Sequence, residues 1–274
     1  MPAVSVVVPA RDAATGLPRL LDALLAQDLP DVQVIVVDDA STDATYDVAA
    51  RHPLGPVVVR GEGKGSYAAR NRGLQEVTAP VVAFTDADCA PVPGWLSAAV
   101  PLVTPDVLVA GVVRQRHREG AGVWERYDRA TYLNQQSLVA QGYAATANLV
   151  MATATLRGLG GFDATLRSSG DRELGQRAVA SGCRVVLATD AIVEHEPRTD
   201  ARSLWALHRR LGAGWRDLAR RGAAPRWWQD GSLREPLGQV IDQLAADGPP
   251  LRRRQVAHVH LLAMAARWRG RLLG

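Results

Sequence analysis

Two aspartates, Asp86 and Asp88, directly follow the apolar run "VVAF" at residues 81–84. Residues two apart on an extended chain point to the same side, so the two carboxylates face the same way. Withdrawing two like charges from water is costly unless something positive lies between them. Such a pair suits a hard divalent cation, Mn²⁺ or Mg²⁺, that phosphate oxygens also hold. The alternative is a solvated turn in which Asp88 caps the following helix.

Polar residues follow three other apolar runs in the first 90 residues. These groups are Pro9-Ala10-Arg11-Asp12, Asp38-Asp39-Ala40-Ser41 and Arg60 to Lys64. In a parallel sheet the carboxyl ends of the strands meet at one edge, and ligands bind there. The spacing therefore predicts that four strand ends converge on one crevice.

The elements that must position these residues alternate along the chain. The expected strands are "VSVVVPA", "VQVIVVDDAS", "GPVVVRG" and "PVVAFTDAD", and helical patterns such as "GLPRLLDALLAQ" and "SYAARNRGLQEV" separate them. This order predicts an α/β fold with a mainly parallel twisted sheet flanked by helices.

The pattern is weaker after residue 90. We expect a strand and a short helix that ends at Gly160-Gly161, then a helix over "GDRELGQRAVASG" and two short strands in "CRVVLATDAIVEHE". Residues 119–145 give no clear pattern. Three helices are expected in the tail, at about 201–221, 232–245 and 251–271.

Composition limits the class of protein. The 274 residues are 47% hydrophobic, enough for a sizeable core, and no apolar run approaches the ~18–20 residues that span a bilayer. With two cysteines and no basic leader in "MPAVSVVVPA", we expect no disulfide framework, no signal peptide and a cytoplasmic protein. A peripheral place at the inner face of the membrane is the alternative localisation.

A change in composition near residue 198 predicts a boundary. Residues 198–274 hold 15 Arg and 6 acidic residues, so they carry +9, whereas the net charge of the whole chain is +4. Lys64 is the only lysine in the chain, so the many arginines reflect a general bias toward arginine. Their number is therefore weak evidence for nucleic-acid binding, and we expect no nucleic-acid partner. The closing helix, with arginines at both ends, suits an anionic membrane surface or packing on the catalytic domain or in a homodimer.

The glycine-rich segment "RGEGKGSY" matches neither phosphate-binding fingerprint. A Walker loop needs Ser or Thr after its lysine, but Gly65 follows Lys64, and a dinucleotide fingerprint should follow the first strand. The remaining interpretations are a flexible basic loop beside an anionic ligand or a plain glycine turn.

Seven segments together have a specific likeness. In chain order they are "VVVPARD", "VVDDASTD", "GKGSYAARNRG", "FTDADC", "GLGGFD", "SGDRELGQRA" and "VEH". Over roughly residues 3–196 this order resembles the family 2 glycosyltransferases of the GT-A fold. The resemblance implies a nucleotide-diphospho-sugar donor, a divalent metal at the paired aspartates and inversion at the anomeric carbon.

The resemblance also implies roles for individual residues. Asp39 is similar to the aspartate that hydrogen-bonds the nucleobase, and Asp171 to the catalytic base. Asp88, His195 and Asp86 match positions of metal ligands. Nine residues would bind the nucleotide sugar: Pro9, Ala10, Arg11, Asp39, Lys64, Arg70, Asp86, Ala87 and Asp88.

Simpler roles are open for several of these residues. Asp171 and Glu173 also suit the first turn of a helix, where the macrodipole favours acids. His195 can be a packed histidine at a strand end. Gly170 stands where the family commonly has a second acid, and Arg11-Asp12 replaces its usual pair.

We therefore expect a catalytic domain over residues 1–197, with a nucleotide-sugar half at about 1–90 and an acceptor half at about 91–197. A basic, Trp-rich helical region would cover 198–274. The Q-x-x-R-W motif of processive synthases is absent from the sequence. The absence of this motif favours transfer of a single sugar over polymerisation. We expect a UDP-sugar as the donor and a hydroxyl group as the acceptor. The sequence does not identify the acceptor molecule. The alternatives are a nucleotidyltransferase and a non-catalytic nucleotide-sugar-binding module.

Overall fold

The computed structural model describes residues 2–222, 240, 244 and 253–273. The chain forms two compact units. The first holds residues 1–114 and 133–195, and the second holds residues 115–132 and 196–274. The predicted catalytic domain over 1–197 and its two halves stay a prediction.

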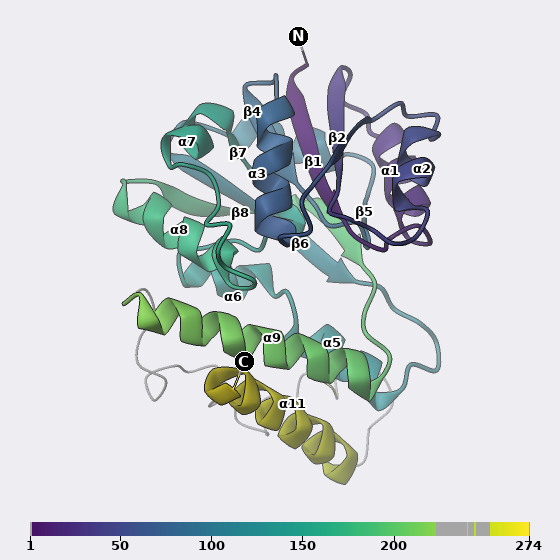
Figure 1. Ribbon diagram of the computed structural model, residues 1–274, viewed down its shortest axis with the longest axis vertical. Coiled ribbons are helices and arrows are strands. Elements are labelled where there is room, and N and C mark those ends of the chain that lie inside the picture. The colour runs from purple at the N-terminus through teal and green to yellow at the C-terminus, as the bar shows by residue number, and fades with distance from the viewer. Residues whose placement is uncertain (1, 223–239, 241–243, 245–252, 274) are drawn as a thin grey trace. The chain divides into compact units, whose positions relative to one another are not determined.

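One mixed sheet runs through the first unit, with the strand order β3-β2-β1-β4-β7-β6-β8-β5 (Figure 1). The strands are β1 Val4–Ala10, β2 Val32–Asp38, β3 Val57–Arg60, β4 Val81–Phe84, β5 Cys89–Pro91, β6 Val107–Gln115, β7 Leu149–Ala152 and β8 Arg184–His195. Strand β1 pairs in parallel with β2 and β4, and β2 pairs in parallel with β3. The pairs β4–β7, β6–β7 and β5–β8 are antiparallel. The parallel part thus covers the four predicted strands of the first 90 residues.

Helices cover the sheet on both sides (Figure 1). Those of the first unit are α1 Leu17–Leu25, α2 Thr45–Ala50, α3 Ser66–Glu76, α4 Trp95–Ala99, α6 Gln135–Ala140, α7 Thr153–Gly158 and α8 Gly170–Ala180, with short 3-10 turns η1 Val100–Leu102 and η2 Thr146–Asn148. Helix α3 packs on β1 and β2. Because both faces of β1 are covered, Val6, Val7 and Val8 are all fully buried.

The end of the first unit differs from the prediction in one strand. We expected two short strands in residues 183–196, but β8 is one strand of 12 residues. Thr189 and Asp190, in the middle of the strand, are both exposed, while Ala188 and Ala191 on either side are buried. The alternation of buried and exposed residues changes phase there, but the strand continues.

The second unit is helical. Its described helices are α5 Val123–Thr131, α9 Ala201–Arg220 and α11 Arg253–Leu273. The predicted helix at 232–245 lies outside the described residues, apart from Val240 and Leu244. One apolar cluster forms the core of this unit and draws residues from α5, α9 and α11. Its members are Tyr127, Leu204, Val240, Leu244, Val256, Val259 and Ala263.

Helix α5 gave no signal in the sequence because its buried residues are mostly charged. Glu125, Arg126 and Asp128 are at most 5% exposed. Arg126 donates a hydrogen bond to the carbonyl of Leu244 (2.6 Å), and Asp128 accepts one from the backbone N–H of Arg198 (2.9 Å). An ion pair between Asp128 and Arg198 accompanies it (3.3 Å). These partners make the burial of Arg126 and Asp128 tolerable. The buried charged residues interrupt the apolar period by which a helix is predicted.

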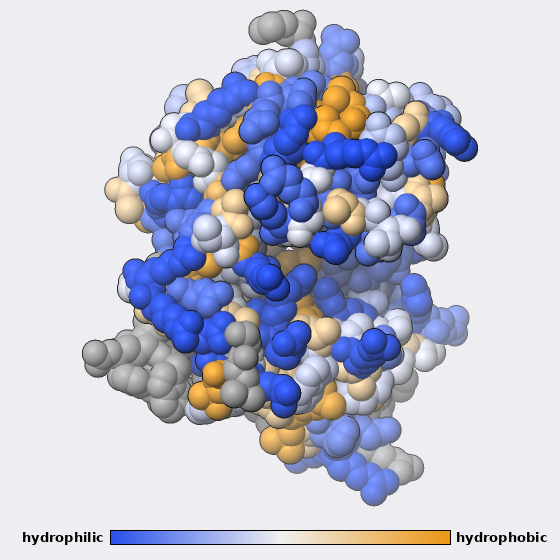
Figure 2. Space-filling view, in the orientation of Figure 1, coloured by the Kyte–Doolittle hydropathy of each residue, from blue (hydrophilic) through white to orange (hydrophobic). Residues whose placement is uncertain are grey.

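Helix α11 packs inside the second unit. Its prediction rested on four apolar positions at helical spacing, of which Val256, Val259 and Ala266 are buried and Leu262 is half-buried. Leu261 and Leu272 are two-thirds exposed, and apolar patches lie among hydrophilic residues over this helix (Figure 2). No helix in the described ranges combines the length and apolar character needed to cross a membrane. Contact of this region with a membrane or a second copy stays a prediction.

Helices α9 and α11 touch through their backbones. A Cβ atom on Gly212 would lie 2.1 Å from the carbonyl oxygen of Arg267, and one on Gly270 would lie 2.0 Å from that of Arg209. Since backbone atoms cannot rotate away as a side chain can, only glycine fits at both positions.

We predict that Gly212→Ala lowers the free energy of unfolding by about 1–3 kcal/mol, because the methyl group forces the two helices apart. Urea unfolding followed by tryptophan fluorescence measures this effect. Gly158→Ala is the matched control, because a Cβ there meets nothing within 4 Å, and we expect it to be neutral or stabilising. Equal stability of the two variants would contradict a tight helix crossing.

Candidate active site

Asp39, just after β2, ties the glycine-rich loop to the sheet. Its carboxylate is buried and accepts hydrogen bonds from the backbone N–H groups of Gly63 and Gly65, both at 2.8 Å. Its own N–H donates to the carbonyl of Ala10 at the end of β1 (2.8 Å). Gly65 directly precedes α3, so Asp39 sets where that helix begins.

Two basic side chains of the predicted nucleotide site, Lys64 and Arg11, lie at the surface. Lys64 forms an ion pair with Glu62 of its own loop (2.5 Å), which raises the pKa of Lys64. Arg11 follows Pro9 and Ala10 at the end of β1, is about half exposed, and lies 3.9 Å from Asp12. Asp12 in turn accepts hydrogen bonds from Thr42, which link the loops after β1 and β2.

The two aspartates after β4 have different partners. Asp86 forms an ion pair of 2.5 Å with Arg70, whose side chain is only 3% exposed. Asp88 is 57% exposed, and its Oδ2 lies 3.5 Å from Nε2 of the buried His195. The pairing of β5 with β8 produces this contact, because it places Cys89 opposite His195. Ala87, between the aspartates, packs on the apolar core.

These positions bear on the predicted metal. Within the part of the chain that the structure describes, no three acidic, histidine or cysteine side chains are grouped closely enough to hold a metal ion. Arg70 already balances the charge of Asp86, so Asp88 and His195 are the pair that fits a cation. Mg²⁺ and Mn²⁺ are commonly held by one or two protein ligands with phosphate oxygens and water, and this pair is compatible with such a site.

Asp171 is the second residue of α8 and is partly buried. Its Oδ1 accepts a hydrogen bond from the N–H of Arg172 (2.9 Å) and lies 3.5 Å from the hydroxyl of Tyr67. Loss of hydration raises the pKa of Asp171, and the charge of Asp86 adds to the rise while that of Arg70 opposes it. Asp171 is therefore close enough to both groups to feel their charges. A carboxyl group with a raised pKa is a better proton acceptor.

The other residues of the α8 motif have structural partners. Arg177 pairs with Glu173 (2.7 Å) and donates to the carbonyls of Gly161 and Leu159. Asn71 of α3 binds the same turn through both the N–H and the carbonyl of Phe162 (2.9 and 2.7 Å). Together they fix the turn that leads toward α8. This role of Asn71 has no signal in the sequence beyond its place in the "ARN" run.

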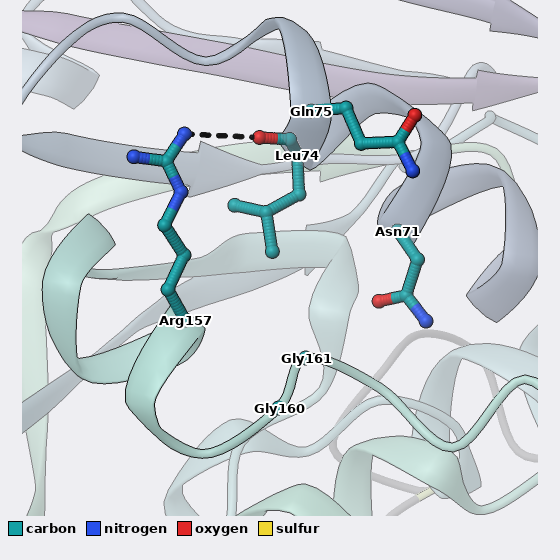
Figure 3. A pocket seen from close by; sticks show the side chains of 6 residues that line it. All are labelled: Asn71, Leu74, Gln75, Arg157, Gly160 and Gly161. Atoms are coloured by element: carbon teal, nitrogen blue, oxygen red, sulfur yellow. Dashed lines mark hydrogen bonds between the residues drawn. The ribbon is translucent and has the colours of Figure 1, made fainter.

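A hollow of about 570 Å³ lies beside this turn (Figure 3). It is lined by Asn71, Leu74, Gln75, Arg157, Gly160 and Gly161. The guanidinium of Arg157 donates to the carbonyls of Leu74 (3.2 Å) and Val77 (2.8 Å) and so caps the end of α3. None of the predicted site residues lines this hollow, which is therefore a separate feature.

Solved structures with the same architecture define the class of fold. The mannosyltransferase PcManGT from Pyrobaculum calidifontis, in complex with GDP-Man and Mn²⁺, superposes with a TM-score of 0.70 at 20% identity, over 99% of this chain and 87% of that one. S. aureus TarS in complex with UDP-GlcNAc gives 0.58 at 18% identity, over 99% and 90%. The predicted GT-A glycosyltransferase fold is confirmed.

The sequence comparisons give the family. The model of glycosyl transferase family 2 matches residues 5–160, more than half of the chain. Glycosyltransferase AglE of Haloferax volcanii is 32% identical over 207 residues, 72% of this chain and 68% of AglE. Pre-mycofactocin glycosyltransferase of Mycobacterium tuberculosis is 33% identical over 219 residues, which cover 73% of this chain but only 44% of that protein. The chain belongs to glycosyl transferase family 2.

We predict that Asp39→Asn speeds hydrogen exchange of the Gly63 and Gly65 amides by about 10- to 100-fold, the loss expected when a charged acceptor becomes neutral. Exchange measured by NMR checks this. Asp47→Asn, an exposed acid on α2, is the control and should leave both amides unchanged. Unaltered exchange in the Asp39 variant would show that the loop is held by other contacts.

Proposed function

We propose that the chain is a metal-dependent, inverting glycosyltransferase that moves one sugar from a nucleotide-diphospho-sugar to an acceptor hydroxyl. The observation that carries this proposal is the set of contacts along α3. Gly65, just before the helix, binds Asp39, Tyr67 lies beside Asp171, and Arg70 binds Asp86. One helix thus joins the proposed nucleobase, catalytic and donor-phosphate residues at one edge of the sheet.

The donor would bind across the ends of β1, β2 and β4. Pro9, Ala10 and Arg11 would line the nucleoside, and Asp39 would face the base. Lys64 and Arg70 would face the diphosphate from either end of the first turn of α3, each already paired with a carboxylate, Glu62 or Asp86. UDP-sugars are our first choice of donor, and GDP-sugars are the alternative, since the structural neighbours hold UDP-GlcNAc or GDP-Man.

Asp88 and His195 would hold the divalent cation. Asp86 would be the third ligand, held in place by its ion pair with Arg70. The metal, when bound, would supply positive charge to the diphosphate as it leaves. Mn²⁺ in the mannosyltransferase structure supports a divalent ion in this fold. The cation would also offset repulsion between the diphosphate and the carboxylates.

Asp171 would act as the base. It would take the proton of the acceptor hydroxyl while the acceptor oxygen bonds to the anomeric carbon and the bond to the diphosphate breaks. Attack from the side opposite the leaving group inverts the configuration. Only the ionised carboxylate can accept the proton, so activity is lost as the pH falls through the pKa of Asp171. Because burial raises that pKa, the loss should begin nearer to neutral pH than for an exposed aspartate.

We predict that Asp88→Asn weakens binding of UDP by at least about tenfold in Mn²⁺, because a carboxylate ligand becomes a neutral amide. Calorimetric titration with UDP and GDP, with Mn²⁺ or with EDTA, measures this and also chooses the nucleotide. Asp190→Asn, an exposed acid on β8, is the control. If the affinity for UDP is the same in the wild type and in Asp88→Asn, and the same in Mn²⁺ and in EDTA, the protein does not use a metal to bind the nucleotide.

We predict that Asp171→Asn lowers kcat by about 10²-fold or more and leaves the affinity for the donor nearly unchanged, because the base acts in the transition state. Release of nucleoside diphosphate from a panel of nucleotide sugars and hydroxyl acceptors measures the rate. Asp190→Asn again serves as control. A collapse of donor binding would make Asp171 a binding residue, and a product with retained anomeric configuration would exclude a single displacement.

A further inference from the structure

The ring of Tyr67 lies against the backbone at the start of α8. A Cβ atom added to Gly170 would lie 2.7–2.8 Å from three carbons of that ring, closer than real Cβ contacts come. Gly170 is in the first turn of a helix, where glycine is less favourable than alanine by roughly 0.5–1 kcal/mol. The tyrosine ring therefore occupies the volume that any side chain at residue 170 would need.

The ring has little freedom to move. Tyr67 is 7% exposed, and its ring stacks on Phe162 with centroids 5.8 Å apart and planes 23° apart. Phe162 meets Phe84 of β4 edge to face at 5.2 Å. The guanidinium of Arg70 lies 5.5 Å from the centroid of the Tyr67 ring. The aromatic stack and Gly170 thus fix the direction in which the hydroxyl points.

That direction is toward Asp171. The Tyr67 hydroxyl lies 3.5 Å from Oδ1 of the carboxylate, at the long end of hydrogen-bond distance. Burial and the negative charge of Asp171 both raise the pKa of Tyr67, so the phenol keeps its proton and remains a donor. Arg70 and Asp86 are the other charged groups that act on Asp171 from outside its own helix.

We infer that Tyr67 is a positioning residue for Asp171: its ring, seated on Gly170, aims a phenol hydroxyl that orients the carboxylate and favours its ionised form. This inference rests on the proposed role of Asp171 as the base. In this arrangement a tyrosine on α3 orients the base. The position of its ring also explains why residue 170 is a glycine, because any side chain there would collide with the ring. Tyr67 would act on the reaction through Asp171 and not through the donor or the acceptor.

The test compares Tyr67→Phe with the wild type. The variant keeps the ring and its packing but removes the donor, so the pKa of Asp171 should rise further and the acidic limb of kcat/KM should move up by roughly half a pH unit. We also expect kcat to fall by about 3- to 10-fold at neutral pH. Titration of ¹³C-labelled aspartate carboxyls, with the Asp171 signal identified from Asp171→Asn, measures the same shift without any donor or acceptor.

A second variant reaches the same contact from the other side. Gly170→Ala should displace the Tyr67 ring and shift the Asp171 titration in the same direction. Gly158→Ala controls for the general effect of the substitution. Tyr127→Phe removes a buried phenol hydroxyl that contacts His260 in the second unit (3.1 Å), and should leave the titration unchanged. Thermal unfolding of each variant checks that it folds.

The outcomes separate this inference from the proposed function. An unchanged Asp171 titration and acidic limb in folded Tyr67→Phe and Gly170→Ala would overturn the inference, even if Asp171→Asn is inactive. If Asp171→Asn is fully active, the base role fails. A shifted carboxyl titration in that case would still show that Tyr67 acts on Asp171.

Discussion

The ion pair between Arg70 and Asp86 fixes the arrangement of acidic groups in the first unit. Arg70 is almost completely buried, whereas Asp86 is about one-third exposed, so loss of Asp86 would leave the Arg70 charge buried and uncompensated, which is strongly destabilising. The pair therefore holds α3 against the end of β4. Tyr67, Arg70 and Asn71 follow one another at helical spacing on α3, so once Arg70 is placed, the contacts with Asp171 and with the turn at Phe162 are placed as well.

The same pair gives the two aspartates after β4 different chemistry. The sequence makes them alike, because both point to the same side of an extended chain. In the structure a protein cation balances Asp86, whereas Asp88 remains more than half exposed beside His195. If the proposed cation binds with the donor, it would meet a site in which Arg70 already balances one of the two carboxylates.

Much of this fold can be predicted from local patterns of apolar and polar residues in the sequence. Fully apolar runs and helical periods predicted β1 to β4 and α1 to α3. The spacing of Asp86 and Asp88 after β4 marked them as site residues, and the family likeness added Asp171 and His195. The contact of Tyr67 with Gly170 could not be found this way, because it joins residues about a hundred positions apart. Asp39 was recognised, but not its hold on the glycine loop. In each case the signal is a packing constraint that exists only after folding.

Helix α5 was not predicted, for a different reason. A helix is predicted from its apolar face, and α5 buries Glu125, Arg126 and Asp128 instead. The prediction of two short strands was wrong for β8, whose backbone continues through Thr189 and Asp190, two exposed polar residues in its middle. Burial of charge and exposure of a strand centre are both decided by tertiary partners.

The discontinuous second unit has a consequence for synthesis on the ribosome. Asp128 of α5 is fully buried, but Arg198, which binds it, comes 70 residues later in the chain. At the usual rates of translation, α5 emerges roughly 4 to 14 seconds before that arginine and still longer before α11. During this interval the strands of the first unit can pair, while the acidic and aromatic face of α5 stays in water or with a chaperone. Every strand of the sheet thus leaves the ribosome before α9 and α11, the helices that pack on α5.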